Sequence, residues 1–143
     1  MLTSARNQFT ARIRHISRGL VNDEIELVLA GGERIVTIIT SNRSLAMRLE
    51  AGRDAIVLVR PSSVILTTEN ISGLMLSARN RLNGTITHLR TDPVNTEVVI
   101  SLKGQDTLVA VLTSDAAKEL ELTVGKTVNA IFKATDVVLG VQR

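Results

Sequence analysis

The tetrapeptide Ser4-Ala5-Arg6-Asn7 recurs unchanged as Ser77-Ala78-Arg79-Asn80 in this chain of 143 residues. The shift between the copies is 77 − 4 = 73 positions, and with it residues 4–68 align with residues 77–141 without a gap. Further identical pairs are His15 with His88, Val21-Asn22 with Val94-Asn95, Glu24 with Glu97, Gly31 with Gly104, Thr40-Ser41 with Thr113-Ser114, and Gly52 with Gly125. The chain is therefore a tandem duplication. We expect a first domain at residues 1–68, a linker at 69–76 and a second domain at 77–143.

Each copy has the pattern of a small, mostly β domain. Runs rich in β-branched residues predict strands at residues 8–17, 24–30, 34–40, 55–60 and 64–68 of the first copy. Residues 41–52 break this period and predict a short helix, with Ser41 as N-cap, Leu45 and Leu49 facing inward, and Gly52 at its end. Three strands, a helix and two strands is the order of an OB-type barrel. We therefore predict an all-β fold of two tandem OB-type five-stranded barrels, each with one short helix.

The composition suits such barrels and excludes several classes of protein. Hydrophobic residues make up 44% of the chain, but Phe9 and Phe132 are the only aromatic ones, so the core must be aliphatic. The chain has no cysteine, which excludes disulfides, thiol catalysis and thiolate–metal sites. No segment reaches the roughly 18–20 apolar residues of a membrane span, and the N-terminus has no apolar stretch of signal-peptide length. We expect a cytoplasmic protein without a membrane partner.

The sequence shows no pattern of an enzyme or of a metal site. It contains no nucleophile elbow, zincin, P-loop or Rossmann motif. His15 and His88 are single, equivalent residues without neighbours at ligand spacing, so we interpret them as strand residues that face either solvent or a partner, and we predict no metal ion bound directly by side chains. Glu24 and Glu97 also recur, but one carboxylate per copy is no acid–base pair, and we expect them at a strand start or an interface. We predict a non-enzymatic protein without a cofactor.

Hydrogen-bond donors recur at equivalent positions of both copies. They are Ser4, Arg6, Thr40, Ser41 and Arg60 in the first copy, and Ser77, Arg79, Thr113, Ser114 and Lys133 in the second. The Thr-Ser pairs also begin the predicted helices, whose first N–H groups are open to anions. Each residue alone has an ordinary alternative role, as a helix cap or a solvated cation. Together, a cluster of donors without a carboxylate suits a small, fully deprotonated oxyanion.

Several motifs also resemble a known family. They are "SARN" at the start of each copy, "GLVNDE" in the first turn, the Thr-Ser pair before each helix, and "VRPSSVIL" or "FKATDVVLGV" at the close. In this order they resemble the Mop domain, twice over essentially the whole chain, as in the two-domain molbindins. These are cytoplasmic proteins that bind molybdate or tungstate. The resemblance implies OB-type barrels, homo-oligomers that are trimers with six Mop domains, and oxyanions held at domain or subunit interfaces for storage or homeostasis of molybdenum.

The resemblance further implies two kinds of anion site. The first would use Ser4, Ala5, Arg6, Thr40, Ser41, Arg60, Ser77, Ala78, Arg79, Thr113, Ser114 and Lys133. The second, near a symmetry axis, would use Gly19, Leu20, Val21, Asn22, Val94 and Asn95.

The chain departs from the family pattern at three places. Arg60-Pro61 stands in the first copy where the family has Lys-Ala. Asp92-Pro93 stands in the second copy where the family favours Gly-Ala, which adds a negative charge and removes a backbone donor. We therefore expect the second kind of site to be weaker in that copy. Ala11 of the first copy stands where the second keeps Gly84.

Selectivity and function leave alternatives open. Molybdate and tungstate carry no proton at neutral pH, whereas phosphate usually carries one that a donor-only site leaves unpaired. Sulfate carries none either, so only the size of the cavity excludes it, and the sequence does not separate molybdate from tungstate. The alternative function is an OB-fold module that binds single-stranded nucleic acid or a protein partner. Because aromatic stacking platforms are nearly absent, we expect no nucleic-acid partner. Mop pairs also occur in DNA-binding regulators and in importer ATPases, but we expect neither role without a helix-turn-helix or a P-loop.

Overall fold

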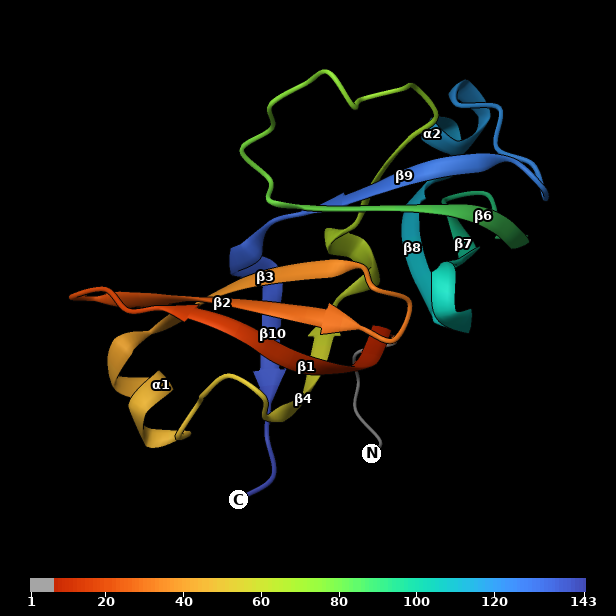
Figure 1. Ribbon diagram of the computed structural model, residues 1–143. Coiled ribbons are helices and arrows are strands. Elements are labelled where there is room, and N and C mark those ends of the chain that lie inside the picture. The colour runs from red at the N-terminus through yellow and green to blue at the C-terminus, as the bar shows by residue number, and fades with distance from the viewer. Residues whose placement is uncertain (1–6) are drawn as a thin grey trace.

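The computed structural model describes residues 7–143 and has the predicted mostly β architecture (Figure 1). The first repeat contains β1 (Asn7–Ser17), β2 (Asn22–Leu29), β3 (Arg34–Thr40), α1 (Ser41–Ala46), β4 (Asp54–Val59), the 3-10 helix η1 (Pro61–Ser63) and β5 (Ile65–Thr67). The second contains β6 (Asn80–Thr91), β7 (Asn95–Ser101), η2 (Lys103–Gln105), β8 (Thr107–Thr113), α2 (Ser114–Glu119), β9 (Thr127–Phe132), η3 (Ala134–Asp136) and β10 (Val137–Gly140). The prediction of two five-stranded OB-type units, each with one short α-helix, is confirmed.

The last strand of each repeat joins the sheet of the other repeat. The two sheets have the orders β10-β4-β1-β2-β3 and β5-β9-β6-β7-β8. β10 pairs antiparallel with β4 from the first repeat, and β5 pairs antiparallel with β9 from the second. In Figure 1 the blue strand β10 accordingly lies beside the yellow-green strand β4 of the first repeat. The sequence order suggests that residues 64–68 complete their own sheet, whereas the structure exchanges the two equivalent strands.

Burial along the strands follows the alternation in the sequence. In β2 every second residue, from Asp23 to Leu29, is buried. Both β1 and β6 contain a register shift. It lies between Ile13 and His15 in β1 and between Ile86 and His88 in β6. This irregularity explains why the alternation is looser there, and it leaves both histidines on the exposed surface. Phe9 is 1% exposed within the aliphatic core, as its place in a strand indicated.

The first helix differs from the prediction in its cap and its facing. Thr40, and not Ser41, is the N-cap, because its Oγ1 accepts the N–H of Arg43 at 3.3 Å. Leu45 is 66% exposed, so the expectation that it faces inward is wrong. Leu49 is buried but lies in the turn after the helix, not within it. A helix of 6 residues has fewer than two turns, too few to bury both leucines on one face.

The segment between the repeats, the green loop in Figure 1, is fastened to the second sheet. The guanidinium of Arg81 donates to the carbonyl oxygens of Ile71 and Leu74. The side-chain amide of Asn129 donates to the carbonyl of Glu69 at 3.0 Å. Within residues 7–143, no helix is long and apolar enough to cross a membrane.

Candidate functional site

The asparagine that ends each "SARN" motif lies buried between the repeats. The side-chain amide of Asn80 donates to the Val36 carbonyl at 2.9 Å and accepts the Val36 N–H at 2.7 Å. Asn7 makes the same pair of bonds with Val109, at 2.7 and 2.6 Å. Each asparagine is thereby fixed to the third strand of the other repeat. Ser4, Ala5 and Arg6 lie outside the described residues, so only Ser77, Ala78 and Arg79 of the second copy can be followed further.

Arg79 and Lys133 meet at one end of the pairing between β6 and β9. Asn80 is paired with Phe132 in this antiparallel ladder, so the residues one step beyond, Arg79 and Lys133, lie opposite each other. Both are exposed. The structure therefore brings together two cations that the sequence placed at opposite ends of the second repeat. Arg60 has the equivalent place after β4, whose last residue pairs with Asn7.

Arg79 and the segment that follows Lys133 contact β2 and β3 of the first repeat. η3, which follows Lys133, is held to β3 by Thr37, whose Oγ1 lies 3.0 Å from the carbonyl oxygen of Val137 and 3.3 Å from that of Ala134. Thr37 is fully buried, so this contact between the repeats is shielded from water. Arg79 and the residues that follow Lys133 therefore lie at an interface with the first repeat.

Arg79 is ion-paired with Glu24 of β2. Its Nη2 and Nη1 atoms lie 3.1 and 3.4 Å from the two carboxylate oxygens. The side chains are 53% and 40% exposed. A carboxylate of the first repeat thus holds the guanidinium fork that we expect to bind an oxyanion. From the sequence, Glu24 was notable because it recurs, and we expect it at a strand start or an interface; the sequence does not indicate which residue it contacts.

The hydroxyl group of Ser41 is engaged inside its own repeat. Its Oγ lies 3.0 Å from the carbonyl oxygen of Gly19 and 2.8 Å from Oδ1 of Asp23. Because a serine has a single hydroxyl proton, Ser41 has little capacity left to donate to an anion. Thr40 accepts a bond as N-cap, and within the described residues no acceptor is recorded for its own proton. Thr40 is therefore the better donor of the two.

The second repeat shows the same arrangement. Thr113 is the N-cap of α2, because its Oγ1 accepts the N–H of Ala116 at 3.1 Å. Oγ of Ser114 lies 2.7 Å from the carbonyl oxygen of Asp92 and 3.0 Å from the Thr96 hydroxyl. Thr113 and Ser114 thus lie beside a turn of their own repeat, whereas Arg79 pairs with Glu24 of the first repeat.

The turns predicted for the second kind of site project from the ends of the barrels. Leu20, Val21 and Val94 are 102%, 72% and 70% exposed. In the second repeat, Oδ1 of Asp92 accepts the N–H groups of Val94 and Asn95, both at 2.8 Å. The N–H groups of Asn95 and Val94 lower the pKa of Asp92. These two backbone donors are therefore already occupied by a carboxylate, which is a physical reason to expect weaker anion binding there.

An ion pair between a buried carboxylate and a half-exposed guanidinium closes the corresponding turn of the first repeat. Asp23, 1% exposed, accepts the Gly19 N–H at 3.1 Å and pairs with the guanidinium of Arg18 at 3.0 Å. The Gly19 N–H, the hydroxyl groups of Ser44 and Ser41, and Arg18 hold the pKa of Asp23 well below its ordinary value. The positions equivalent to Arg18 and Asp23 hold threonines in the second repeat. Sequence reasoning missed this network, because comparison of the two repeats highlights residues that both share, and Arg18 and Asp23 occur only in the first.

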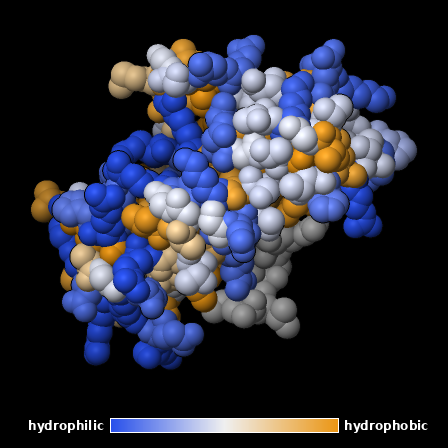
Figure 2. Space-filling model, turned by 45° about the vertical axis from the view of Figure 1, so that its right-hand side comes forward, coloured by the Kyte–Doolittle hydropathy of each residue, from blue (hydrophilic) through white to orange (hydrophobic). Residues whose placement is uncertain are grey.

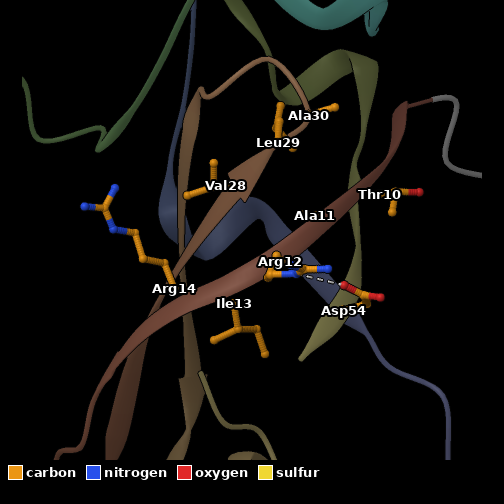
Figure 3. A pocket seen from close by; sticks show the side chains of 9 residues that line it. All are labelled: Thr10, Ala11, Arg12, Ile13, Arg14, Val28, Leu29, Ala30 and Asp54. Atoms are coloured by element: carbon orange, nitrogen blue, oxygen red, sulfur yellow. Dashed lines mark hydrogen bonds and ion pairs between the residues drawn. The ribbon is translucent and has the colours of Figure 1, made fainter. Parts of the chain in front are cut away.

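Two pockets differ in their relation to the predicted site. One, of about 440 Å³, lies on β1 and β2 and contains an Arg12–Asp54 ion pair at 3.2 Å, but none of the predicted residues (Figure 3). The other, of about 530 Å³, is lined by both repeats and includes Arg79 with Arg34 and Lys103. Arg79 therefore lies at a hollow with cationic walls. Among residues 7–143, no group of three or more histidine, aspartate or glutamate side chains is placed to hold a metal ion.

Comparison with known proteins identifies the family. A model described as the TOBE domain matches residues 3–66 and 76–139. The chain belongs to the TOBE domain family. The two matches follow the internal repeat, and they support the resemblance to tandem Mop domains.

Relatives of this TOBE chain have names connected with molybdenum. The molybdenum transport protein ModE of Herbaspirillum seropedicae is 39% identical over 143 residues, which are 100% of this chain and 53% of that protein. The molybdenum-pterin-binding protein MopA of Rhodobacter capsulatus is 34% identical over 97% of this chain and 52% of its own length. The chain thus spans about half the length of the curated relatives it matches.

A solved structure covers the whole TOBE chain. It is described as the cytoplasmic molybdate-binding protein ModG with molybdate bound, and its TM-score is 0.94 at 36% sequence identity. The match covers 99% of this chain and 100% of that one. Together with the family match, it confirms the similarity to molybdate-binding proteins with tandem Mop domains.

Proposed function

We propose that this chain binds molybdate, or the similar tungstate, reversibly at interfaces between its repeats, for storage or homeostasis of molybdenum in the cytoplasm. The observation that carries the proposal is the position of Arg79 opposite Lys133 at one strand end, with Arg79 against the other repeat. The similarity to ModG over the full length of both chains supports the same ligand class.

The chemistry of the residues suits a small dianion. A guanidinium can bind two oxygens in parallel, whereas the ammonium of Lys133 acts as a point charge. Glu24, the partner of Arg79, lies opposite Ile38 in the pairing of β2 with β3. Thr40 is two residues beyond Ile38 on the same face of β3, so its hydroxyl group would add a donor near Arg79. Ser77 and the backbone of Ala78 would complete the second-repeat site. Ser4, Ala5, Arg6 and Arg60 are proposed for the equivalent site of the first repeat.

Removal of either cation tests the proposal. Because hydrogen bonds to charged groups contribute roughly 1.5–3 kcal/mol, Arg79→Ala and Lys133→Ala should each weaken molybdate binding by about tenfold or more. Isothermal titration of the purified chain measures this. Arg12→Ala is the matched control, because it removes an exposed arginine from the pocket of Figure 3. Equal affinities for Arg79→Ala and the unaltered chain would refute this site, as would an equal loss in Arg12→Ala.

We also propose that the chain assembles as a trimer with six domains. Apolar side chains are exposed at equivalent places of both repeats: Val21 and Val94 in the turns, and Ile65 and Val138 in the exchanged strands. On the face shown in Figure 2, hydrophobic side chains form separate patches among polar ones. Light scattering coupled to size-exclusion chromatography should give three times the chain mass of 15.5 kDa. A monomeric mass at micromolar concentration would exclude the trimer.

The alternative of nucleic-acid binding has less support in the structure. Phe9 and Phe132, the only aromatic residues of the chain, are each 1% exposed, so neither can stack on a base. We therefore expect no salt-sensitive binding of single-stranded DNA in fluorescence anisotropy. The regulator ModE of Escherichia coli, described as DNA-binding, is 28% identical over 51% of its length. A sensing role within a longer protein would use the same anion site.

A further inference from the structure

The ion pair between Arg79 and Glu24 joins a predicted anion ligand to a carboxylate of the other repeat. Both guanidinium nitrogens of the fork face a carboxylate oxygen, at 3.1 and 3.4 Å. This is the geometry in which an arginine binds a planar oxyanion with two parallel bonds. The carboxylate therefore occupies the same nitrogens that an anionic ligand would use.

A carboxylate and a dianion cannot both approach this guanidinium closely without repelling each other. The two side chains remain 53% and 40% exposed, and ion pairs of this kind are weak because water and salt screen them. Such a pair can be opened at small cost, unlike a fully buried one. The carboxylate of Glu24 therefore competes with an anion for the guanidinium of Arg79, but the ion pair is weak enough for the anion to displace it.

We propose that Glu24 is a built-in competitor for the oxyanion at Arg79, which the anion displaces on binding and which takes the guanidinium back on release. Glu24 then determines how tightly the anion is held without contacting it. The inference rests on the proposed oxyanion-binding function and adds a residue that sets the affinity. By the equivalence of the two repeats in sequence, we extend the proposal to Glu97 of the second repeat.

The strand itself offers a matched control. Glu26 lies two residues after Glu24, on the same half-buried face of β2, and it pairs with Arg34 instead of Arg79. Glu26→Gln therefore removes the same charge from the same strand but leaves the guanidinium of Arg79 paired. Glu24→Gln keeps the size of the side chain and removes only the charge that competes.

The test is isothermal titration of molybdate into the full chain, as the unaltered protein, Glu24→Gln, Glu24→Gln with Glu97→Gln, and Glu26→Gln. Circular dichroism establishes that each variant is folded. Glu24→Gln should bind about threefold to tenfold more tightly at low salt, the double variant should show this at both copies, and Glu26→Gln should differ by less than about twofold. The gain should shrink as the ionic strength rises from about 0.01 to 1 M, because the screening length falls from roughly 30 to 3 Å.

The outcomes separate this inference from the proposed function. If the unaltered chain and Glu26→Gln bind molybdate but Glu24→Gln binds no more tightly than they do, the competitor role is wrong and oxyanion binding stands. Weaker binding by Glu24→Gln would mean that the carboxylate positions Arg79 for the anion, which also overturns the inference. If no protein binds molybdate at all, the proposed function fails, and the competitor role fails with it.

Discussion

At the scale of single residues, the buried carboxylate of Asp23 links the fold of the first repeat to pH. Its pKa is lowered from 3.8, so the folded chain keeps it ionised where the unfolded chain would take up a proton. This contribution to the free energy of unfolding is therefore complete above the unfolded pKa and is lost as the pH falls below about 3.8. Asp23→Asn should be less stable at pH 7 and should lose less stability between about pH 5 and 2.

Urea unfolding at a series of pH values measures the effect. Asp54→Asn is the control, because the Asp54 side chain is 74% exposed and its ion pair with Arg12 is open to water. It should change neither the stability at pH 7 nor the dependence on pH by much. An Asp23→Asn variant with the pH dependence of the unaltered chain would contradict the assignment.

Single residues also mark where sequence reasoning ended. The recurrence of Glu24 showed that the position is shared, but its partner Arg79 lies in the other copy, 79 − 24 = 55 positions away. A periodic pattern reports which face of a strand is buried and carries no information on such a distant contact. The N-cap was misplaced by one residue because Thr40 and Ser41 are both good caps, and only the backbone geometry distinguishes them.

At the scale of elements, the strands were predictable because buried residues alternate with more exposed ones throughout β2, β4 and β7, and in the first half of β9. The difference between Ala11 in β1 and Gly84 in β6 has a structural reason. A Cβ atom on Gly84 would lie 2.5 Å from Cγ2 of Ile100 and 2.6 Å from the carbonyl oxygen of Ser101. Contact distances this short require either the side chain or the strand to move. The second repeat therefore needs the glycine, whereas the first accommodates alanine.

Gly84→Ala should accordingly destabilise the chain by about 1–3 kcal/mol, the usual cost of overpacking a core. The free energy of unfolding in urea measures this directly. The reciprocal change, Ala11→Gly, creates no clash and should cost about 0.5–1 kcal/mol through backbone entropy. The explanation would be wrong if Gly84→Ala were as stable as the unaltered chain.

At the scale of the whole molecule, exchange of β5 and β10 makes each barrel depend on the other half of the chain. The internal repeat could not predict this exchange, because equivalent strands fit either sheet by sequence. Two independent barrels would melt separately, but here neither sheet is complete alone. We expect one cooperative thermal transition, with equal calorimetric and van't Hoff enthalpies. Two resolved transitions in differential scanning calorimetry would show that the repeats unfold independently.

The most direct measurement is a crystal structure with tungstate bound, in which anomalous scattering locates the heavy atom. We expect an anion within hydrogen-bonding distance of Arg79 and Lys133, beside β2 and β3 of the first repeat, with Glu24 no longer paired to Arg79. Tungstate found only away from these two cations, or no bound tungstate at saturating concentration, would contradict a site built from cations of the second repeat against the first.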